Sequence, residues 1–546
     1  MELLHHFKEL TIRPKNAKEL KGLILQLAIQ GKLTGHWRKE NPGIESASEL
    51  LKDIIKNKEV LIKSKIARKE NAKKEFLKDK VSFLIPETWI SKNITEFYYT
   101  IGGKSNQIQS KNYSETGKYP IVSQGKNRID GYSDDESKLL KITKPIIVFG
   151  DHTRLVKFID FDFIIGADGT KILSPFDGVD SEYFYLHTSS YDLSSKGYAR
   201  HYSLLKLEAF ALPPLEEQKE IVKIVETLFK EVEQLEQLTV ERIALKEDFV
   251  TSALNQLTSN NANQEWSFLQ EHFKPFFNET TNIKKLRETV LQLAVQGKLT
   301  ADWRANNPNT EDASVLLKRI QEEKAQLIKD KKIKKEKALP EITEEDIPYE
   351  LPEGWVWCRL NEILHSSFYG PRFGKEEYVD NGVPTIRTTD MNSKGFIKLK
   401  NPPTIKLTEE KLKLYKVEKG DLLVTRTGSI GTMAIFNEEY DAIPSAYLIR
   451  FRFLIVNIEY VFNLMHSPYG QKSLGLLTNT VAQPNINATS IKDIPFPLPP
   501  LEEQKAIVEK VNAIMGLCDA LEQEVQQSQA HSEMLMQSVL REVFEG

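Results

Sequence analysis

The chain contains the stretch ILQLAIQGKLTGHWRKENP at residues 24–42 and a near-copy, VLQLAVQGKLTADWRANNP, at residues 290–308, with 13 of 19 positions identical. A second stretch, LPPLEEQKEIVKIVETL at residues 212–228, recurs as LPPLEEQKAIVEKVNAI at residues 498–514, with 11 of 17 positions identical. Internal similarity of this kind indicates copies of one structural unit. The sequence therefore predicts two related halves.

Each half consists of a repeated frame around an insert of its own. The inserts, residues 90–211 and 356–497, are 122 and 142 residues long and share little sequence. Because the frame recurs and the inserts differ, we expect the frame to perform one task twice and each insert to perform its own. The predicted frame domains are residues 1–89, residues 212–355 and the C-terminal helix at residues 498–546.

Composition limits the functions that need to be considered. The chain carries 74 Lys+Arg against 77 Asp+Glu, a net charge of −3, so any nucleic-acid surface must be local. Only two cysteines, Cys358 and Cys518, are present, which excludes a disulfide framework and a Cys-based zinc site, and the histidines show no metal-ligand spacing. Neither a secretory signal nor a long apolar run is evident. We expect a cytoplasmic protein without membrane contact and without a metal of its own.

The frame contains a Lys-rich helical segment in each copy. Residues 50–80 carry 11 Lys/Arg against 5 Asp/Glu, and residues 318–337 carry 9 against 4. Such helices either bind DNA phosphates through counterion release or present a solvated or partner-contacting face while their Leu/Ile stripe packs on the frame. Mixing of Lys with Glu favours the second interpretation.

A long helix follows each Pro-Pro pair of the frame. Apolar residues step by four and three along the C-terminal copy, at Ile507, Val511, Ile514, Cys518, Leu521 and Val525. The central copy shows the same step at Ile221, Val225, Leu228, Val232 and Leu235. This spacing is that of a coiled-coil seam, and helices of about 40 residues would be on the order of 60 Å long.

Both inserts have the pattern of mixed α/β domains with short strands. Residues 145–149 and 421–424 are predicted short strands, and each enters a polar loop, Gly150–Arg154 in the first insert and Thr425–Thr432 in the second. The predicted fold class is therefore an α+β multidomain chain. Two mixed α/β domains are joined by a pair of long antiparallel coiled-coil helices, with a pseudo-twofold internal repeat.

The arrangement resembles the specificity (S) subunit of Type I restriction-modification systems over nearly the whole chain. The doubled QLAxQGKLTxxWR and LPPLEEQKxIV frames, PETW at residues 86–89 and PEGW at residues 352–355 carry the resemblance. Within the inserts, GDHTR with GADGTKIL, and GDLLVTRTGSIG with AIPSAYLIRFR and QPNINA, resemble two types of target-recognition domain of that family. Residues 1–89 include a full frame, as in the longer subgroup of the family.

The resemblance implies a non-catalytic role. Each target-recognition domain would read one half of a bipartite, gapped site in double-stranded DNA, and the conserved helices would set the spacing. The frames would dock two modification (adenine-N6 methyltransferase) subunits, and restriction (ATP-dependent translocase/nuclease) subunits would join the complex. No cofactor is expected on this chain, whereas the partners would use S-adenosylmethionine, ATP and Mg²⁺.

Catalytic motifs are incomplete. Residues 401–404, Asn-Pro-Pro-Thr, lack the aromatic residue with which the Asn-Pro-Pro-aromatic motif of adenine methyltransferases stacks on a flipped base, so a turn is favoured. Gly103-Lys104-Ser105 matches the end of a phosphate loop, but Tyr98 occupies the position of its first glycine. The sequence therefore predicts a protein that is not itself an enzyme.

The candidate site residues are those suited to DNA, namely Arg for guanine, Asn or Gln for adenine, and Lys, Ser or Thr for phosphate. In the first insert they are Lys104, Ser105, Lys126, Asn127, His152, Arg154, Arg200 and His201. In the second they are Arg372, Lys375, Arg387, Thr388, Arg426, Thr427, Ser429, Gln483, Asn485 and Asn487. The last two asparagines either contact bases or close turns, and Gly428 and Gly431 either shape a phosphate-binding loop or serve a tight turn.

The sequence is also compatible with a structural protein that does not bind DNA. A coiled-coil scaffold with two protein-binding modules would show the same frame and inserts. It differs in that its binding would be indifferent to DNA sequence and to salt.

Overall fold

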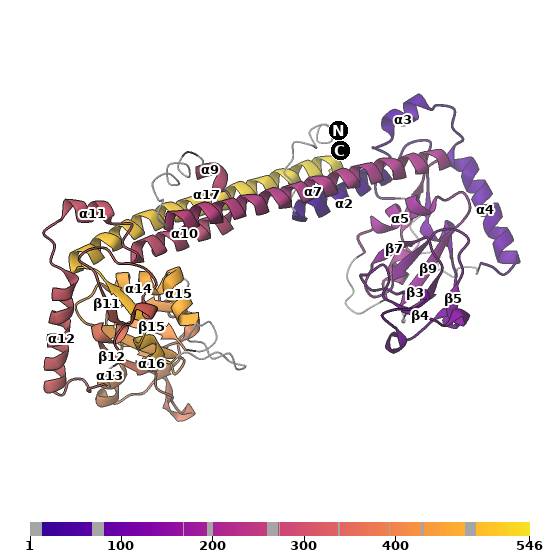
Figure 1. The fold of residues 1–546 in the computed structure, drawn as a ribbon. Helices are drawn as coiled ribbons and strands as arrows, with labels where there is room; N and C mark the ends of the chain where they lie inside the picture. The colour runs from indigo at the N-terminus through magenta and orange to yellow at the C-terminus, as the bar shows by residue number, and fades with distance from the viewer. Residues whose placement is uncertain are drawn as a thin grey trace. The chain divides into compact units, whose positions relative to one another are not determined.

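The computed structural model describes residues 14–67, 81–166, 169–193, 200–258, 271, 273–336, 339–392, 394–426, 431–475 and 487–545. The chain divides into two compact units, one formed by residues 1–243 with 531–546 and the other by residues 244–530 (Figure 1). The first unit contains the insert at residues 90–211, and the second contains the insert at residues 356–497. Within the described residues, no helix combines the length and apolar character needed to cross a membrane.

The frame of the first unit is helical. It contains α2 (Pro14–Ile29), α3 (Gly35–Glu40), α4 (Ala47–Lys63) and the first part of α7 (Leu215–Thr258). Helix α2 ends just before Gly31, whose φ of 68° is the left-handed conformation that glycine adopts without strain. Leu20 and Ile24 of α2 are buried with Ile221 and Val225 of α7, so the α7 seam packs on the frame helix.

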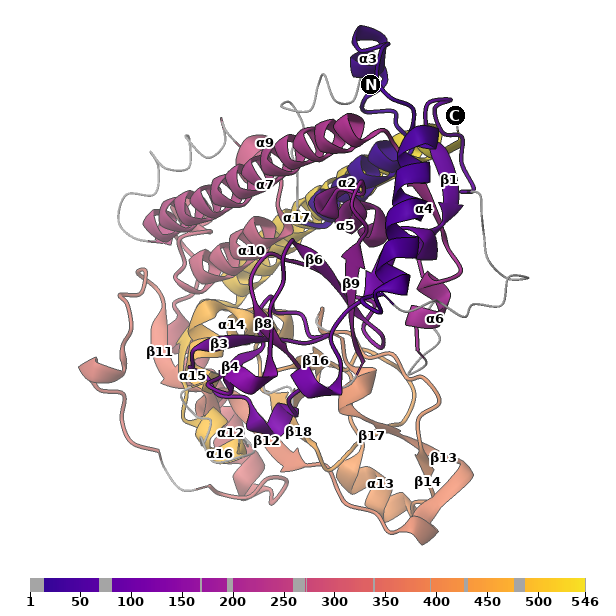
Figure 2. The ribbon, with the colours of Figure 1, turned by 90° about the vertical axis from the view of Figure 1, so that its right-hand side faces the viewer.

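The first insert is built from two four-stranded sheets. One has the order β2 (Tyr98–Thr100), β9 (Thr170–Pro175), β6 (Ile146–Gly150), β7 (Val156–Ile159), and all its pairs are antiparallel. The other has the order β4 (Gly131–Ser133), β3 (Tyr119–Val122), β8 (Phe163–Ile165), β5 (Leu139–Leu140), with β3 and β8 parallel. Helices α5 (Ser181–Ser189) and α6 (Tyr202–Leu205) complete the insert. Figure 2 shows α4 beside this insert, where Leu51 and Ile54 join its core.

The second unit repeats the plan. Its frame contains α9 (Phe273–Phe276), α10 (Thr280–Val295), α11 (Ala301–Asn306), α12 (Ala313–Lys329) and α17 (Leu501–Glu545), which runs from this unit into residues 531–546. Its insert has one sheet ordered β12 (Leu364–Tyr369), β18 (Leu448–Phe453), β15 (Leu422–Thr425), β16 (Met433–Ile435). A second sheet is ordered β14 (Thr404–Ile405), β13 (Tyr378–Ile386), β17 (Ile443–Pro444), and the helices are α13 (Glu409–Tyr415), α14 (Ile458–His466), α15 (Pro468–Gly475) and α16 (Ala488–Lys492).

The predicted apolar seam of α17 is buried in the second unit. Val511, Cys518 and Val525 share one core with Leu254 of α7 and Leu286 of α10. Figures 1 and 2 both show α10 lying along α17. The expected fold class is confirmed, and each seam also packs against a frame helix.

A short ribbon closes each insert at its base. β1 (Ile90–Asn93) pairs antiparallel with β10 (Ala209–Leu212), and β11 (Val356–Arg359) pairs in the same way with β19 (Pro495–Leu498). The chain therefore leaves and re-enters the frame at adjacent positions. This arrangement suits exchange of one insert for another.

Candidate nucleic-acid interface

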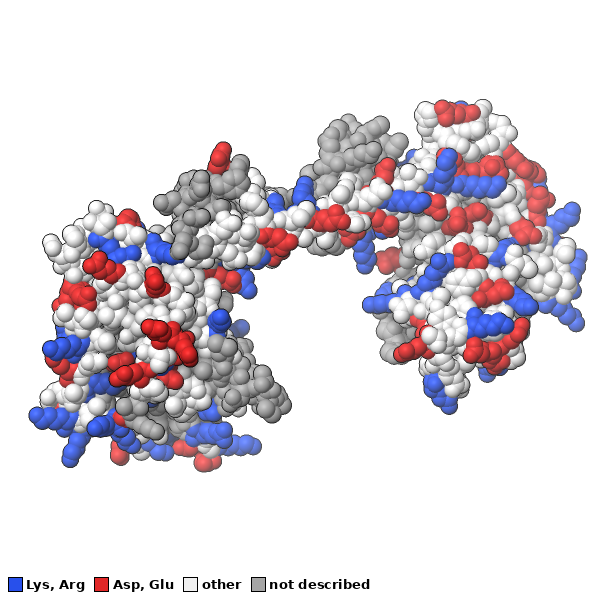
Figure 3. All heavy atoms as spheres, in the orientation of Figure 1, with Lys and Arg blue, Asp and Glu red and all other residues white. Residues whose placement is uncertain are grey.

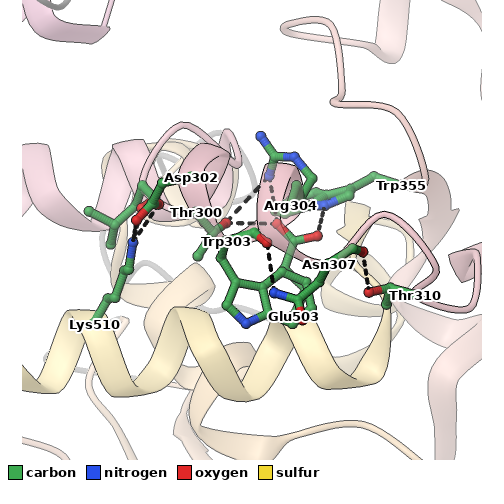
Figure 4. A network of polar contacts seen from close by, with 10 residues as sticks. Thr300, Asp302, Trp303, Arg304, Asn307, Thr310, Trp355, Glu503 and Lys510 are labelled. Carbon is green, nitrogen blue, oxygen red and sulfur yellow. Dashed lines mark hydrogen bonds and ion pairs between the residues drawn. The ribbon is translucent and has the colours of Figure 1, made fainter.

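Each frame contains a buried carboxylate, and Figure 4 shows the one of the second unit. In the second unit, Glu503 in the first turn of α17 has only 1% of its side chain exposed. It accepts hydrogen bonds from Trp355 Nε1 at 2.8 Å and Thr300 Oγ1 at 2.7 Å, and Arg304 forms an ion pair with it at 2.5 Å. A buried carboxylate is tolerated when its lone pairs and its charge are satisfied in this way. Three separate stretches of the frame thus meet on one residue.

The first unit has the same network. Glu217 accepts hydrogen bonds from Trp89 Nε1 at 2.8 Å and from Thr34 Oγ1 at 2.6 Å, and it forms an ion pair with Arg38. The GKLTxxWR stretch supplies the threonine and the arginine, the Pro-Glu-x-Trp stretch supplies the tryptophan, and LEEQ supplies the carboxylate. This shared network explains why three stretches recur together.

The adjacent glutamine holds the insert. Gln218 Oε1 accepts a 2.7 Å hydrogen bond from the amide of Asp180, the residue that caps α5. Gln504 Oε1 accepts a 2.8 Å bond from the amide of Asn457, which caps α14. Both glutamines are fully buried, so the frame fixes the start of one helix in each insert in the same way.

In the first insert, a buried aspartate organises the predicted loop at residues 150–154. Asp151 Oδ1 accepts a 2.8 Å hydrogen bond from the amide of Tyr202, and its carbonyl accepts one from the amide of His201, also at 2.8 Å. The amide of His152 donates to Gln124 Oε1 at 3.0 Å. The structure therefore brings the predicted residues His152 and His201 together and adds Gln124, which the sequence analysis did not identify.

The side chains around this loop differ in their accessibility. Arg154 is exposed, has a φ of 63° and donates from Nη1 to the carbonyl of Leu193 at 2.9 Å. His201 is only 1% exposed, and its Nδ1 lies 3.1 Å from the Asp151 carbonyl oxygen, so it supports the loop from within. Arg200 next to it is exposed.

The remaining candidates of the first insert lie on exposed connections. Lys126 and Asn127 are exposed between β3 and β4. Lys104 and Ser105 are exposed in a 3-10 helix (Lys104–Asn106) that Asn106 anchors to the carbonyl of Leu139 at 3.3 Å. This hydrogen bond holds the helix beside β5.

In the second insert, an exposed tyrosine links two of the predicted residues. The Arg426 guanidinium lies 4.8 Å from the ring centroid of Tyr369, and the Tyr369 hydroxyl accepts a 2.8 Å hydrogen bond from the amide of Ala488. Asn487, next to Ala488, caps α16 by accepting from the amide of Ser490 at 2.8 Å. Tyr369 is 39% exposed. The structure thus gathers Arg426 and Asn487 around an aromatic ring that is open to solvent.

The other candidates of this insert are distributed more widely. Arg372 and Lys375 are exposed beyond the end of β12. Arg387 is held at 2.8 Å by Asp390, whose hydrogen bond raises the pKa of the guanidinium, and Thr388 lies half-buried beside it. Four predicted residues lie outside the described residues: Thr427, Ser429, Gln483 and Asn485.

The sequence did not identify Gln124, Tyr369 and Tyr447 as candidates. For the two tyrosines, the residue type explains why. A tyrosine at the end of a strand usually belongs to the core, but Tyr447 is 61% exposed and its carbonyl accepts a 3.0 Å bond from the Arg426 amide. Gln124 carried a signal, since it stands in a polar loop that contains the predicted Lys126 and Asn127.

Charge is distributed unevenly over the surface (Figure 3). Lys and Arg side chains gather at the end of the second unit around α13, which contains Lys411 and Lys413. Elsewhere on the visible face both signs are interspersed. Within the described part of the chain, no cluster of three or more His, Cys, Asp or Glu residues is arranged to hold a metal ion.

Comparisons with known proteins agree with this organisation. The family model described as "Type I restriction modification DNA specificity domain" matches residues 86–242 and 352–528, together more than half of the chain. The specificity subunit of the Type I restriction enzyme EcoEI from Escherichia coli is 29% identical over 561 residues, covering 94% of this chain and 92% of that protein. The EcoAI specificity subunit from Escherichia coli is 27% identical, with coverages of 92% and 90%.

The comparison with solved structures aligns most of the chain at low sequence identity. The crystal structure of the HsdS subunit from Thermoanaerobacter tengcongensis aligns with 86% of this chain and 100% of that chain, at 15% sequence identity and a TM-score of 0.41. The family assignment rests on the two sequence-domain matches, which confirm the resemblance noted from the motifs. The chain therefore belongs to the family of Type I restriction-modification DNA specificity proteins and carries the family domain twice.

Proposed function

We propose that this chain is the sequence-specificity subunit of a Type I restriction-modification complex and that it catalyses no step itself. One observation carries the proposal: the specificity domain occurs twice, with the same buried network in both frames and a different side-chain surface on each insert. The relatives that cover most of the chain are named specificity subunits. The same match disfavours the alternative scaffold with two protein-binding modules.

Each insert would read one half of a bipartite, gapped site in double-stranded DNA. In the second insert, Arg426 would contact bases or phosphates beside the Tyr369 ring, with Asn487 presented next to it. In the first insert, His152 and Arg154 on the β6–β7 loop and Lys126 on the β3–β4 loop would face the DNA, while His201 positions the loop. Arg, Asn and Lys are the residue types that pair with guanine, adenine and phosphate. The remaining predicted residues keep the DNA-contacting roles proposed from the sequence.

The repeated frames would each dock one methyltransferase subunit, and the long helices α7 and α17 would fix the gap between the two half-sites. Restriction subunits would join the same complex in the cytoplasm. S-adenosylmethionine, ATP and Mg²⁺ would be bound by those partners and not by this chain. The chemistry would therefore belong to the partners, and this chain would choose where it occurs.

Methylation mapping tests the proposal. DNA from cells that express only the partner methyltransferase is compared with DNA from cells that express both the methyltransferase and this chain. We expect a methylated adenine in each half of one split motif only when both are present. Exchange of residues 90–211 for those of another family member should change one half of the motif, and exchange of residues 356–497 the other.

The alternative functions predict other outcomes. If the two proteins associate but no chain-dependent motif appears, the scaffold function is supported. A motif that appears with the chain alone would show that the chain is itself an enzyme.

A further inference from the structure

Two short frame helices share a tryptophan that the fold does not explain. Helix α3 reads GHWRKE and helix α11 reads ADWRAN, so only the Trp-Arg pair is identical. The arginines, Arg38 and Arg304, bind the buried carboxylates. Trp37 and Trp303 are half-buried, and within the described residues neither indole takes part in a hydrogen bond or a ring contact. Because the exposed neighbours have diverged, an identical tryptophan in both copies indicates a shared external contact.

In the second unit this tryptophan lines a pocket. The pocket has a volume of about 520 Å³ and is bordered by Trp303, Asn307, Pro308, Glu353 and Pro500. Figure 4 shows the Trp303 indole between α11 and the start of α17, next to Asn307. The corresponding residues of the first unit are identical: Trp37, Asn41, Pro42, Glu87 and Pro214.

Three of these positions are exposed in both copies, which makes their identity informative. Asn41 and Asn307 each donate from Nδ2 to the tryptophan carbonyl at 2.8 Å, which orients the helix end. Pro42 and Pro308 are exposed. Glu87 and Glu353 are exposed as well and form no ion pair in the described residues. No ion pair among the described residues of either unit accounts for a carboxylate at this place.

The charge of the pocket selects its occupant. Glu503 neutralises Arg304, and the carboxylate of Glu353, which Glu87 repeats in the first unit, remains at the border. Asp312 adds a second carboxylate in this unit, where the first unit has Ser46. The Asp312 carboxylate stays ionised because hydrogen bonds from Ser314 lower its pKa. An aromatic wall beside carboxylates favours a Lys or Arg side chain, through cation–π and charge attraction, and repels a phosphate.

We propose that Trp37 and Trp303 anchor a basic side chain from the same segment of two copies of one protein partner. The inference rests on the proposed function, in which that partner is the methyltransferase subunit, and it identifies the residues of the docking surface. Glu87 and Glu353 would pair with the same basic side chain. Two equivalent anchors on the two frames would bind two partner copies through identical contacts.

The test measures how many methyltransferase copies the full chain binds, by native mass spectrometry of the purified complex. We expect two copies on the unaltered chain, one on Trp37→Ala or Trp303→Ala, and none on the double variant at concentrations that saturate the unaltered chain. The charge-reversal variants Glu87→Lys and Glu353→Lys lie on the surface and should act in the same way without affecting folding. Glu40→Asn and Asn306→Glu, which each introduce the residue of the other copy at an exposed position outside the pocket lining, serve as controls and should leave two copies bound.

The outcomes separate the two proposals. Two copies bound to the folded double tryptophan variant, or to the double charge-reversal variant, would overturn the docking inference and leave the specificity function intact. If the unaltered chain binds no methyltransferase, the proposed function fails instead.

Discussion

Trp355 Nε1 lies 2.8 Å from Glu503 Oε2 and donates a hydrogen bond to that buried oxygen. Trp355 stands one residue before β11, where the chain enters the second insert, and Glu503 lies in the first turn of α17, just after the chain has left it. The bond therefore ties the entry of the insert to the helix that follows its exit. Trp89 and Glu217 form the same bond in the first unit, also at 2.8 Å.

Removing this carboxylate should destabilise the unit that contains it. Glu503→Ala leaves Arg304 with an unpaired charge in a largely buried position, and loss of one partner of a buried pair costs about 3–5 kcal/mol. Hydrogen–deuterium exchange of the full chain should show faster opening of residues 280–310. Glu502→Ala is the matched control, because Glu502 is exposed and forms a surface ion pair with Lys505, so its loss should cost at most about 1 kcal/mol. Equal effects of the two substitutions would contradict the role given to Glu503.

The hydrogen bond between His187 and Ala211 in the first unit has no counterpart in the second, where both residues are replaced. His187 Nε2 accepts a 3.0 Å hydrogen bond from the amide of Ala211, and both residues are buried. In the second unit Pro497 replaces the alanine and has no amide hydrogen, and Leu464 occupies the matching position of α14. His187→Leu should therefore cost about 1–3 kcal/mol, because it leaves a buried donor unsatisfied. Adding Ala211→Pro should recover much of that loss in a thermal unfolding experiment, whereas additive losses would show that the two positions are independent.

The same histidine should make the first unit sensitive to acid. Burial lowers the pKa of His187 to about 3, whereas an imidazole in an unfolded chain titrates near 6.5. The unfolded state therefore binds more protons between these values, so the His187 contribution to stability is complete above about pH 6.5 and is lost progressively as the pH falls towards 3. His187→Leu combined with Ala211→Pro should flatten this dependence. An unchanged slope in the double variant would assign the acid sensitivity to other groups.

The repeat made the frame predictable, because two copies in one chain showed which positions are fixed. It did not show why they are fixed. Glu216 and Glu217 both fit the first turn of a helix, where acids favour the dipole, yet Glu216 is exposed beside Lys219 and Glu217 is buried among three partners. Glu217 is buried and Glu216 is not because α3 and the Pro-Glu-x-Trp turn pack over Glu217. Sequence spacing does not show where those distant segments pack.

The inserts were less predictable, because each occurs only once and residue type was the main guide. Residue type predicts Arg426 as a DNA contact, and the structure places it over Tyr369, which no sequence pattern distinguishes from a core tyrosine. Residue type also predicts His201 as a DNA contact, but its side chain is buried against the Asp151 carbonyl. Residue type identifies chemical capacity, whereas accessibility depends on packing between distant segments.

Arg154 allows backbone and side-chain effects to be separated in the first insert. Its φ of 63° is strained for a residue with a Cβ, so Arg154→Gly should be more stable than Arg154→Ala by about 1 kcal/mol. Both variants lose the bond to the Leu193 carbonyl and the guanidinium. We expect both to reduce methylation directed by the first half-site at least tenfold, measured by mapping methylated adenines. A defect in the alanine variant alone would indicate that backbone geometry matters and that the side chain does not.

Tyr369 provides the corresponding test in the second insert. Tyr369→Phe keeps the ring under Arg426 but removes the hydroxyl that accepts from the Ala488 amide, so the position of Asn487 should become less fixed. Tyr369→Ala removes both contacts. We expect the phenylalanine variant to relax the base preference of the second half-site, and the alanine variant to weaken its recognition by at least tenfold, while the first half-site is read as before.

Tyr378→Phe is the control for these variants, because Tyr378 is also exposed in the second insert and its hydroxyl has no partner in the described residues. Mapping of methylated adenines gives both half-sites from one sample, so a loss of assembly is recognised as a loss in both halves. A defect confined to the second half places Tyr369 in base reading. If Tyr369→Ala leaves the motif unchanged in both halves, the Arg426–Tyr369 surface is not the reading surface, and the exposed residues Arg372 and Lys375 become the next candidates.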